Sequence, residues 1–195
     1  TVASEKRSPA FYRSIIKGLS YEDVCQKYRD DGLVVASTWS NCMRQLGNES
    51  IDIYPSDLTV QKLWCEENGI VFDQCSDSIV PDILDAQIAK IKPDIIFFYC
   101  GAVHGGIGNH YIGQLKNKFR FLRLVTVFWG DYRPNRWYES LSNVIDIAFT
   151  NGKGYRDKMI ASGIEAYENH PSFDSIVHNK ININNIQPEN DFIFV

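Results

Sequence analysis

The sequence predicts an α/β protein with a Rossmann-like, doubly wound parallel sheet and helices on both faces. Three short runs, residues 95–99, 121–128 and 145–149, are apolar on both alternating sides, which is typical of strands buried on two faces. Segments with helical spacing of apolar residues lie between these runs, and this alternation indicates βαβ units. At 195 residues the chain is long enough for one well-buried domain.

Each predicted helix combines apolar residues at helical spacing with a start or stop signal. In chain order these helices cover residues 9–19, 20–29, 38–46, 58–68, 83–91, 110–119, 135–141 and 153–162. Ser20 and Asp23 have the spacing of a capping box. Asp57 is placed to cap the helix that starts at Leu58, and Gly69 is placed to end it.

The predicted strands are short apolar or alternating runs between turn-forming residues. They cover residues 51–54, 70–72, 95–99, 121–128, 145–149 and 164–168. Residues 33–36 fit either a strand or the lead-in to the following helix, and the sequence leaves both open. Open parallel sheets bind ligands beyond the carboxyl ends of their strands. We therefore expect the functional face at residues 100–109 and at the loops beside them.

Composition and charge exclude several classes of protein. The net charge of −4 and the pI of about 5.5 give no nucleic-acid footprint. The basic residues at 116–120 are expected to be solvated at a helix end. The five cysteines form no C-x-x-C pair, and the sequence has no signal peptide or membrane-length apolar run. These features predict reduced thiols, a cytoplasmic protein and no membrane span.

The glycine-rich loop at residues 101–108 is the first candidate binding element. Its spacing matches neither the dinucleotide-binding fingerprint nor a P-loop. It fits a loop that contacts a ligand, or one in which glycine is needed for positive φ or close approach. His104 lies in this loop, where a neutral imidazole can accept a proton from an attacking hydroxyl. A loop histidine bonded to backbone is the alternative.

Asp131 follows the second buried run and is the other candidate base. It equally fits the first position of a turn. Trp129 and the aromatic residues near it offer flat faces to a sugar ring, or else simply pack at the rim. The candidate catalytic residues are thus His104 and Asp131, and the candidate substrate-binding residues are Gly101, Gly105, Gly106, Asn109, Trp129, Gly130, Arg133 and Asn151. The four histidines show no metal-binding spacing, so we expect no metal and no cofactor.

Several segments carry a resemblance to a known family. They are Met43-Arg-Gln-Leu-Gly47, Leu58 to Gly69 with Trp64, Ile91-Lys-Pro-Asp-Ile-Ile-Phe97, Ile145-Asp-Ile-Ala-Phe-Thr150, Ser162-Gly163-Ile164 and His170-Pro-Ser-Phe-Asp174. From Ser20 onward their order resembles the amino-terminal half of a GT-B glycosyltransferase. It is most similar to the spore-maturation-protein-type glycosyltransferase-like family and its group-1 relatives. The resemblance covers roughly three quarters of the chain.

The resemblance implies transfer of a sugar from a nucleotide-sugar donor to a hydroxyl of a glycan or small-molecule acceptor, as in polysaccharide biosynthesis. It implies a reaction without an obligatory metal, in a cleft between two halves, with the donor bound by the half that follows. Residues 1–30 are then amino-terminal helices and residues 31–178 the Rossmann-like acceptor-side domain. Residues 179–195 are expected to be a linker and the first strand of a missing carboxyl-terminal domain.

Two other interpretations stay open. One is a non-catalytic Rossmann-like module that binds a sugar or a protein. The other is half of a nucleotide-sugar epimerase, for which only His104 and Asp131 are available as site residues. A further ~150–200 residues of α/β pattern after Val195 is expected for a two-domain enzyme, and its absence would favour the binding module.

Overall fold

The computed structural model describes residues 16–31, 36–71, 79–99, 107–130 and 138–169. These residues divide into two compact units. The larger unit holds residues 16–24 and the described residues from 53 to 169, and the smaller one holds the described residues from 25 to 52. The predicted linker and final strand, most of the predicted helix at 9–19, and residues 33–35 lie outside the described ranges.

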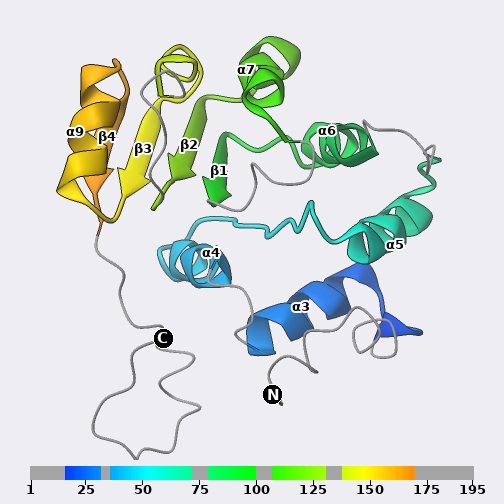
Figure 1. Cartoon of the computed structure of the whole chain (residues 1–195). Helices are drawn as coiled ribbons and strands as arrows, with labels where there is room; N and C mark the ends of the chain where they lie inside the picture. The colour runs from blue at the N-terminus through cyan, green and yellow to red at the C-terminus, as the bar shows by residue number, and fades with distance from the viewer. Residues whose placement is uncertain (1–15, 32–35, 72–78, 100–106, 131–137, 170–195) are drawn as a thin grey trace, which may run out of the picture. The chain divides into compact units, whose positions relative to one another are not determined.

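The larger unit is built on a four-stranded parallel sheet. Its strands are β1 (Ile95–Tyr99), β2 (Leu124–Phe128), β3 (Ile147–Thr150) and β4 (Glu165–Glu168). They pair in the order β1-β2-β3-β4, and every pair is parallel (Figure 1). The prediction that the three central apolar runs share one parallel sheet is therefore confirmed.

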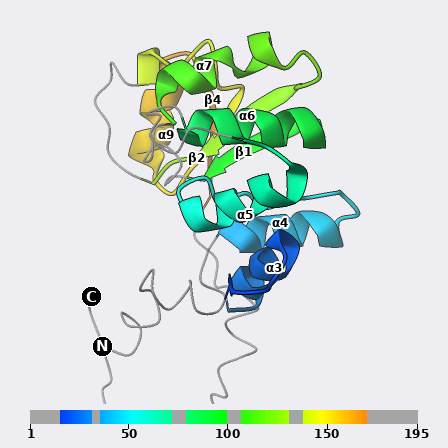
Figure 2. The ribbon, with the colours of Figure 1, turned by 90° about the vertical axis from the view of Figure 1, so that its right-hand side faces the viewer.

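One face of the sheet forms the core of this unit. Strand register aligns Phe98 with Val127, Val127 with Ala148, and Ala148 with Ala166, so their side chains point to the same side. All four belong to one buried apolar cluster. The helices that contribute to this cluster are α6 (Ile79–Ile91), α7 (Asn109–Lys118) and α9 (Lys153–Ala161). In Figure 2 α6 and α7 face the viewer, with α5 (Leu58–Asn68) below them.

The predicted arrangement of helices on both faces is not found in the described part of the sheet. Helices α6, α7 and α9 all pack into the cluster on a single face. The reason lies in strand order, because right-handed crossovers place every helix on one side unless the order reverses. The strands predicted at 51–54 and 70–72 would have allowed a reversal. Residues 51–54 and 70–71 have no regular structure, so these two predictions are wrong where the chain is described.

The opposite face of the sheet is aromatic, and we call it the aromatic face. It carries Phe97, Tyr99, Phe128, Phe149 and Tyr167. The rings of Tyr99 and Phe128 stack with centroids 5.4 Å apart. Phe149 contacts Phe97 edge-on at 6.4 Å and Tyr167 at 6.2 Å. The ring contacts thus form two groups that together involve all four strands.

Local signals set the ends of two helices as predicted. In α3 (Tyr21–Asp31) the Ser20 hydroxyl accepts from the Asp23 amide at 3.1 Å, and the Asp23 carboxylate accepts from the Ser20 amide at 3.1 Å. This is a complete capping box. Asp57 caps α5 by accepting from two backbone amides, and Gly69 ends it with φ 64°. That positive φ explains the glycine.

The smaller unit is organised around Asp52. This carboxylate accepts a hydrogen bond from Ser40 of α4 (Ala36–Gln45) at 2.7 Å. The guanidinium of Arg29 lies 3.6 Å away and that of Arg44 3.9 Å away. The contacts fix Asp52 by charge and hydrogen bonds, whereas a strand would have fixed it by backbone pairing.

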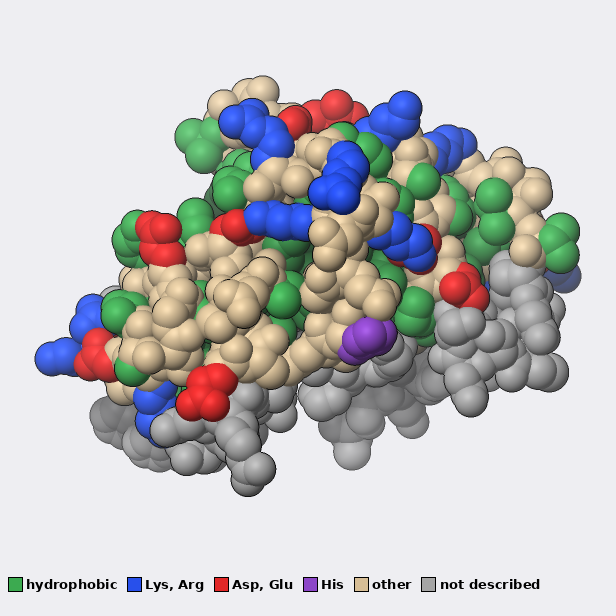
Figure 3. Space-filling view, turned by 90° about the horizontal axis from the view of Figure 1, so that it is seen from above, with side chains coloured by type: hydrophobic (Ala, Val, Ile, Leu, Met, Phe, Trp, Pro, Cys, Tyr) green, Lys and Arg blue, Asp and Glu red, His purple; other side chains and the backbone are tan. Residues whose placement is uncertain are grey.

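The predicted solvated basic residues of α7 lie in ion pairs. Lys116 pairs with Asp146, and Lys118 pairs with Asp85. Figure 3 shows Lys and Arg side chains gathered on this side of the molecule with Asp and Glu side chains among them. The prediction of a surface role for these lysines is confirmed.

Candidate functional site

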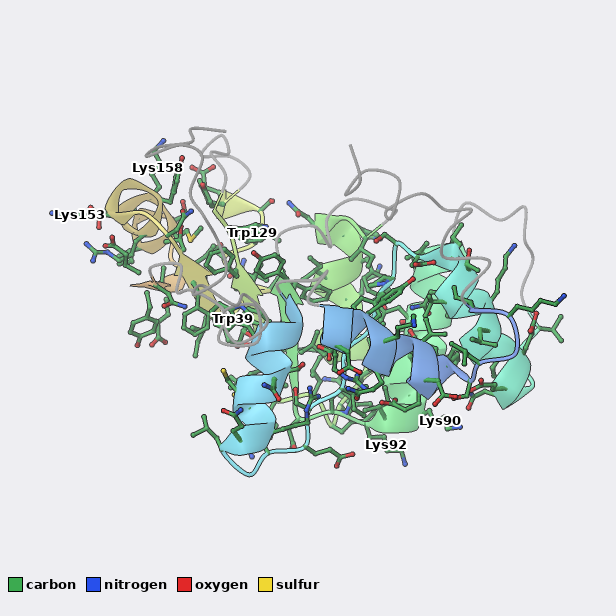
Figure 4. All side chains as sticks on the ribbon, turned by 90° about the horizontal axis from the view of Figure 1, so that it is seen from below. Trp39, Lys90, Lys92, Trp129, Lys153 and Lys158 are labelled. Carbon is green, nitrogen blue, oxygen red and sulfur yellow. The ribbon has the colours of Figure 1, made fainter. Side chains whose placement is uncertain are left out.

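The carboxyl edge of the sheet is the candidate site, because parallel sheets bind ligands there. Four of the predicted site residues are described, and each follows a strand in sequence. Asn109 is the first residue of α7, Trp129 and Gly130 follow β2, and Asn151 follows β3. Figure 4 views the molecule from the side toward which the strand arrows of Figure 1 point, with Trp129 labelled.

Gly130 and Asn151 are neighbours across the edge. A methyl group added to Gly130 would lie 3.0 Å from Nδ2 of Asn151, which is closer than ordinary contact. A larger residue at 130 would therefore make the Asn151 side chain shift by a few tenths of an ångström. Asn151 itself is exposed and follows the end of β3.

Trp129 is fully buried. This burial agrees with the alternative that its ring packs within the protein and does not offer a face to a sugar. Its backbone amide donates to the Phe149 carbonyl at 2.8 Å and extends the pairing of β2 with β3. Its side chain continues the row of Val127, because alternate residues of a strand share a face. A role for Trp129 in stacking against a sugar stays a prediction that this burial does not favour.

Asn109 is held by a different contact. Its Nδ2 donates to the Ser140 hydroxyl at 2.8 Å, which ties the start of α7 to the segment before β3. Its Oδ1 is buried without a hydrogen-bond partner. The residue thus joins two segments of the edge, but it does not bond to Gly130 or Asn151.

Thr150, the last residue of β3, is a polar residue that the sequence analysis did not single out. It is fully buried, and its hydroxyl has no hydrogen-bond partner. Two residues later Gly152 is the N-cap of α9, with no side chain capping the helix. The sequence pattern that could have identified Thr150 is a hydroxyl residue at a strand end, followed by Asn151-Gly152 and a helix.

The other predicted site residues lie outside the described ranges. They are Gly101, His104, Gly105 and Gly106 after β1, and Asp131 and Arg133 after β2. Their roles stay predictions that rest on the sequence.

Other site types find no support in the described residues. No three His, Cys, Asp or Glu residues come together there in a group that could hold a metal ion. None of the described helices is long and apolar enough to cross a membrane. Cys25, Cys42 and Cys65 are free thiols. Burial raises the pKa of the Cys65 thiol, which disfavours the reactive thiolate.

The fold and the edge together define an α/β protein with a parallel sheet and polar side chains at its carboxyl edge. No protein-family model matches the chain. No curated protein and no solved structure is significantly similar to it.

Proposed function

We propose that this chain is the acceptor-side half of a GT-B-type glycosyltransferase, with a Rossmann-like fold. The proposal rests on the sequence resemblance and on one structural observation, the clustering of Gly130 and Asn151 at the carboxyl edge of a parallel sheet. A sheet edge with a glycine beside an exposed asparagine suits close approach of a hydroxyl-rich ligand. The two candidate bases, His104 and Asp131, belong to the segments that leave β1 and β2 at this edge.

In the proposed reaction the acceptor hydroxyl attacks the anomeric carbon of the donor sugar. The new C–O bond forms as the bond to the nucleoside diphosphate breaks, and the hydroxyl proton passes to a base. His104 or Asp131 takes that proton. Asn151 orients the acceptor through its amide, which both donates and accepts hydrogen bonds.

The donor site belongs, in this proposal, to the other half of the GT-B architecture. The nucleotide sugar then meets the acceptor in the cleft between the halves. No metal or cofactor is proposed, and the reaction is placed in the cytoplasm. Each of these statements extends the resemblance and is open to the tests below.

Turnover of the complete protein tests the catalytic assignment. A mass-spectrometric screen of nucleotide-sugar donors and hydroxyl acceptors first identifies a product. His104→Ala and Asp131→Asn are then compared, and substitution of the base is expected to lower kcat by about 10²–10⁴-fold while donor binding survives. The matched controls are His110→Ala, exposed and bonded along α7 to Gln114, and Asp94→Asn, exposed just before β1 at the amino edge. Unchanged turnover in both test variants would remove the catalytic proposal.

Binding of nucleotide sugars by the 195-residue chain alone tests whether the donor site lies outside this chain. Half of a cleft covers little of its ligand, so UDP-, GDP- and dTDP-sugars should bind weakly and should not be turned over. Micromolar or tighter binding in calorimetry would place the donor site in this chain and contradict the acceptor-side assignment. Interconversion of two nucleotide sugars without an acceptor would favour an epimerase.

A further inference from the structure

The start of α9 has unused hydrogen-bond donors. Its N-cap, Gly152, is extended at φ −147° and ψ 133°, and no side chain caps the helix. The amides of Tyr155 and Arg156 both donate to the Gly152 carbonyl, at 3.0 and 3.1 Å. The amides of Gly152, Lys153 and Gly154 are donors in none of the hydrogen bonds of the described chain. Three N–H groups at the positive end of a helix therefore point to no acceptor.

Thr150 supplies a second and independent observation. It is fully buried with an unpartnered hydroxyl, and a buried polar group without a partner calls for a ligand or another explanation. Its side chain lies on the same face as Ala148, which shares a buried cluster with Met159 of α9. Since α9 starts two residues after Thr150, the hydroxyl and the first turn of α9 both belong to the carboxyl end of β3.

The charges around this turn leave it open to an anion. Glu168 is aligned with Thr150 in the sheet and would repel a negative ligand. Its carboxylate is paired with Arg156 of α9 at 3.6 Å, and Arg156 also binds Asp157. Lys153, labelled in Figure 4, is exposed and forms no ion pair within the described residues. Lys153 thus adds a positive charge to the turn with the free amides.

We propose that the first turn of α9 and the Thr150 hydroxyl bind a phosphate group carried by the acceptor. Amide N–H groups at a helix start and a hydroxyl donor are the groups that bind phosphate oxygens in proteins. The phosphate site stands on the geometry of β3 and α9 alone. Its assignment to the acceptor rests on the proposed function, because this chain is there the acceptor half.

An NMR titration of the 195-residue chain with methyl phosphate tests the site. Saturable shifts are expected in the amide signals of Gly152, Lys153 and Gly154, which sodium chloride at the same ionic strength does not produce. Thr150→Val should weaken the binding by about tenfold or more, as expected for loss of one hydrogen bond to a charged group. Thr150→Ser keeps the hydroxyl and should stay within about twofold of the wild type.

Thr126→Val is the matched control, because Thr126 is also a buried strand threonine but its side chain is on the opposite face. It should leave phosphate binding unchanged. Shifts absent from the wild type, shifts equal with chloride, or equal affinity in Thr150→Val would each overturn the site. If Thr150→Val does not fold, the wild type and Thr150→Ser still test the phosphate site. The largest shifts must then occur at residues 152–154 in both proteins, and shifts centred elsewhere would overturn the site.

Two further ligands separate the sources of the phosphate. Glucose 6-phosphate binding more tightly than methyl phosphate supports an acceptor phosphate. UDP binding more tightly than glucose 6-phosphate at the same amides would overturn the acceptor assignment. None of these titrations needs a donor or turnover, so a failed search for glycosyl transfer leaves their outcome intact.

Discussion

The two faces of the sheet differ although the same four strands form both. On the core face Phe98, Val127 and Ala148 are 5%, 0% and 0% exposed. On the aromatic face the next residues along the strands, Phe97 and Phe149, are only partly buried, and Tyr167 is 51% exposed. A run that is apolar on both alternating sides therefore does not imply equal burial of its two sides.

The difference follows from the order of the strands. Because the order does not reverse, α6, α7 and α9 all cover the core face. The side chains of that face are buried against these helices, whereas the rings of the aromatic face contact one another. We infer that the core face supplies most of the stability of the larger unit.

The adjacent residues Phe97 and Phe98 give the largest test of this comparison. Phe98→Ala should lower the free energy of unfolding by about 3–5 kcal/mol, the usual cost of emptying a buried phenylalanine site. Phe97→Ala should cost less, about 1–2 kcal/mol, because part of that ring is already in water. Urea titration of both variants measures the difference. Equal losses would mean that both faces are equally packed.

The local features of the fold were predictable because they depend on neighbours in sequence. Ser20 with Asp23 forms the capping box, and Asp57 and Gly69 bound α5, as their spacing indicates. Residues 95–99 form β1 because a β-branched and aromatic run between turn formers is sufficient to identify a strand.

Features that depend on distant contacts were not predictable. The alternation at residues 51–54 indicates a strand, but Asp52 bonds instead to Ser40 and lies beside Arg44. Those partners cannot be read from the alternation itself. The strand predicted at 70–72 likewise has no regular structure where it is described.

The candidate site was predictable in part. Gly130 and Asn151 lie together because they follow β2 and β3, which are neighbours in the sheet, and their role in binding stays a prediction. The burial of Trp129 follows because it shares a sheet face with Val127. This was predictable, since alternate residues of a strand point to the same face. Thr150 was missed because a threonine at a strand end is ordinary, and only its buried, unpartnered hydroxyl distinguishes it.

A double-mutant cycle on Tyr99 and Phe128 tests whether the aromatic face adds stability of its own. The stacked rings should show a coupling of about 0.5–1.5 kcal/mol beyond their separate losses. The control cycle pairs Tyr99 with Val127, whose side chain is on the other face, and its coupling should be below about 0.5 kcal/mol. Absence of coupling between the two rings would show that their stacking adds no stability to the protein.

Two buried threonines give a smaller test, one on each face. Thr126 donates to the Ile96 carbonyl at 3.3 Å, so Thr126→Val should cost about 0.5–1.5 kcal/mol in the absence of phosphate. Thr150 has no partner to lose, so Thr150→Val should be neutral or slightly stabilising. Thermal unfolding in phosphate-free buffer compares the two. A larger loss at Thr150 would show that its hydroxyl has a partner within the protein.

The smallest effects concern two tyrosines whose pKa values are raised for different reasons. Tyr111 packs against the buried cluster, and burial, followed by the charge of Asp85, raises its pKa. Tyr167 on the aromatic face is exposed, and its hydrogen bond to Glu165 raises its pKa above 10.0. Glu165→Ala should therefore return Tyr167 toward its ordinary pKa, whereas Asp85→Asn should lower the pKa of Tyr111 only in part, because burial also raises it.

Site-resolved NMR titration of ¹³C-labelled tyrosine separates these two causes. The neutral phenol is the form that donates to Glu165, so folding raises the pKa of Tyr167. Its contribution to stability is then present below the unfolded-state pKa of 10.0 and is lost as the pH rises through the folded-state value. A Tyr167 titration that Glu165→Ala does not move would contradict the hydrogen bond. A Tyr111 titration that Asp85→Asn returns to that of an exposed tyrosine would mean that charge dominates on the core face, where burial is expected to dominate.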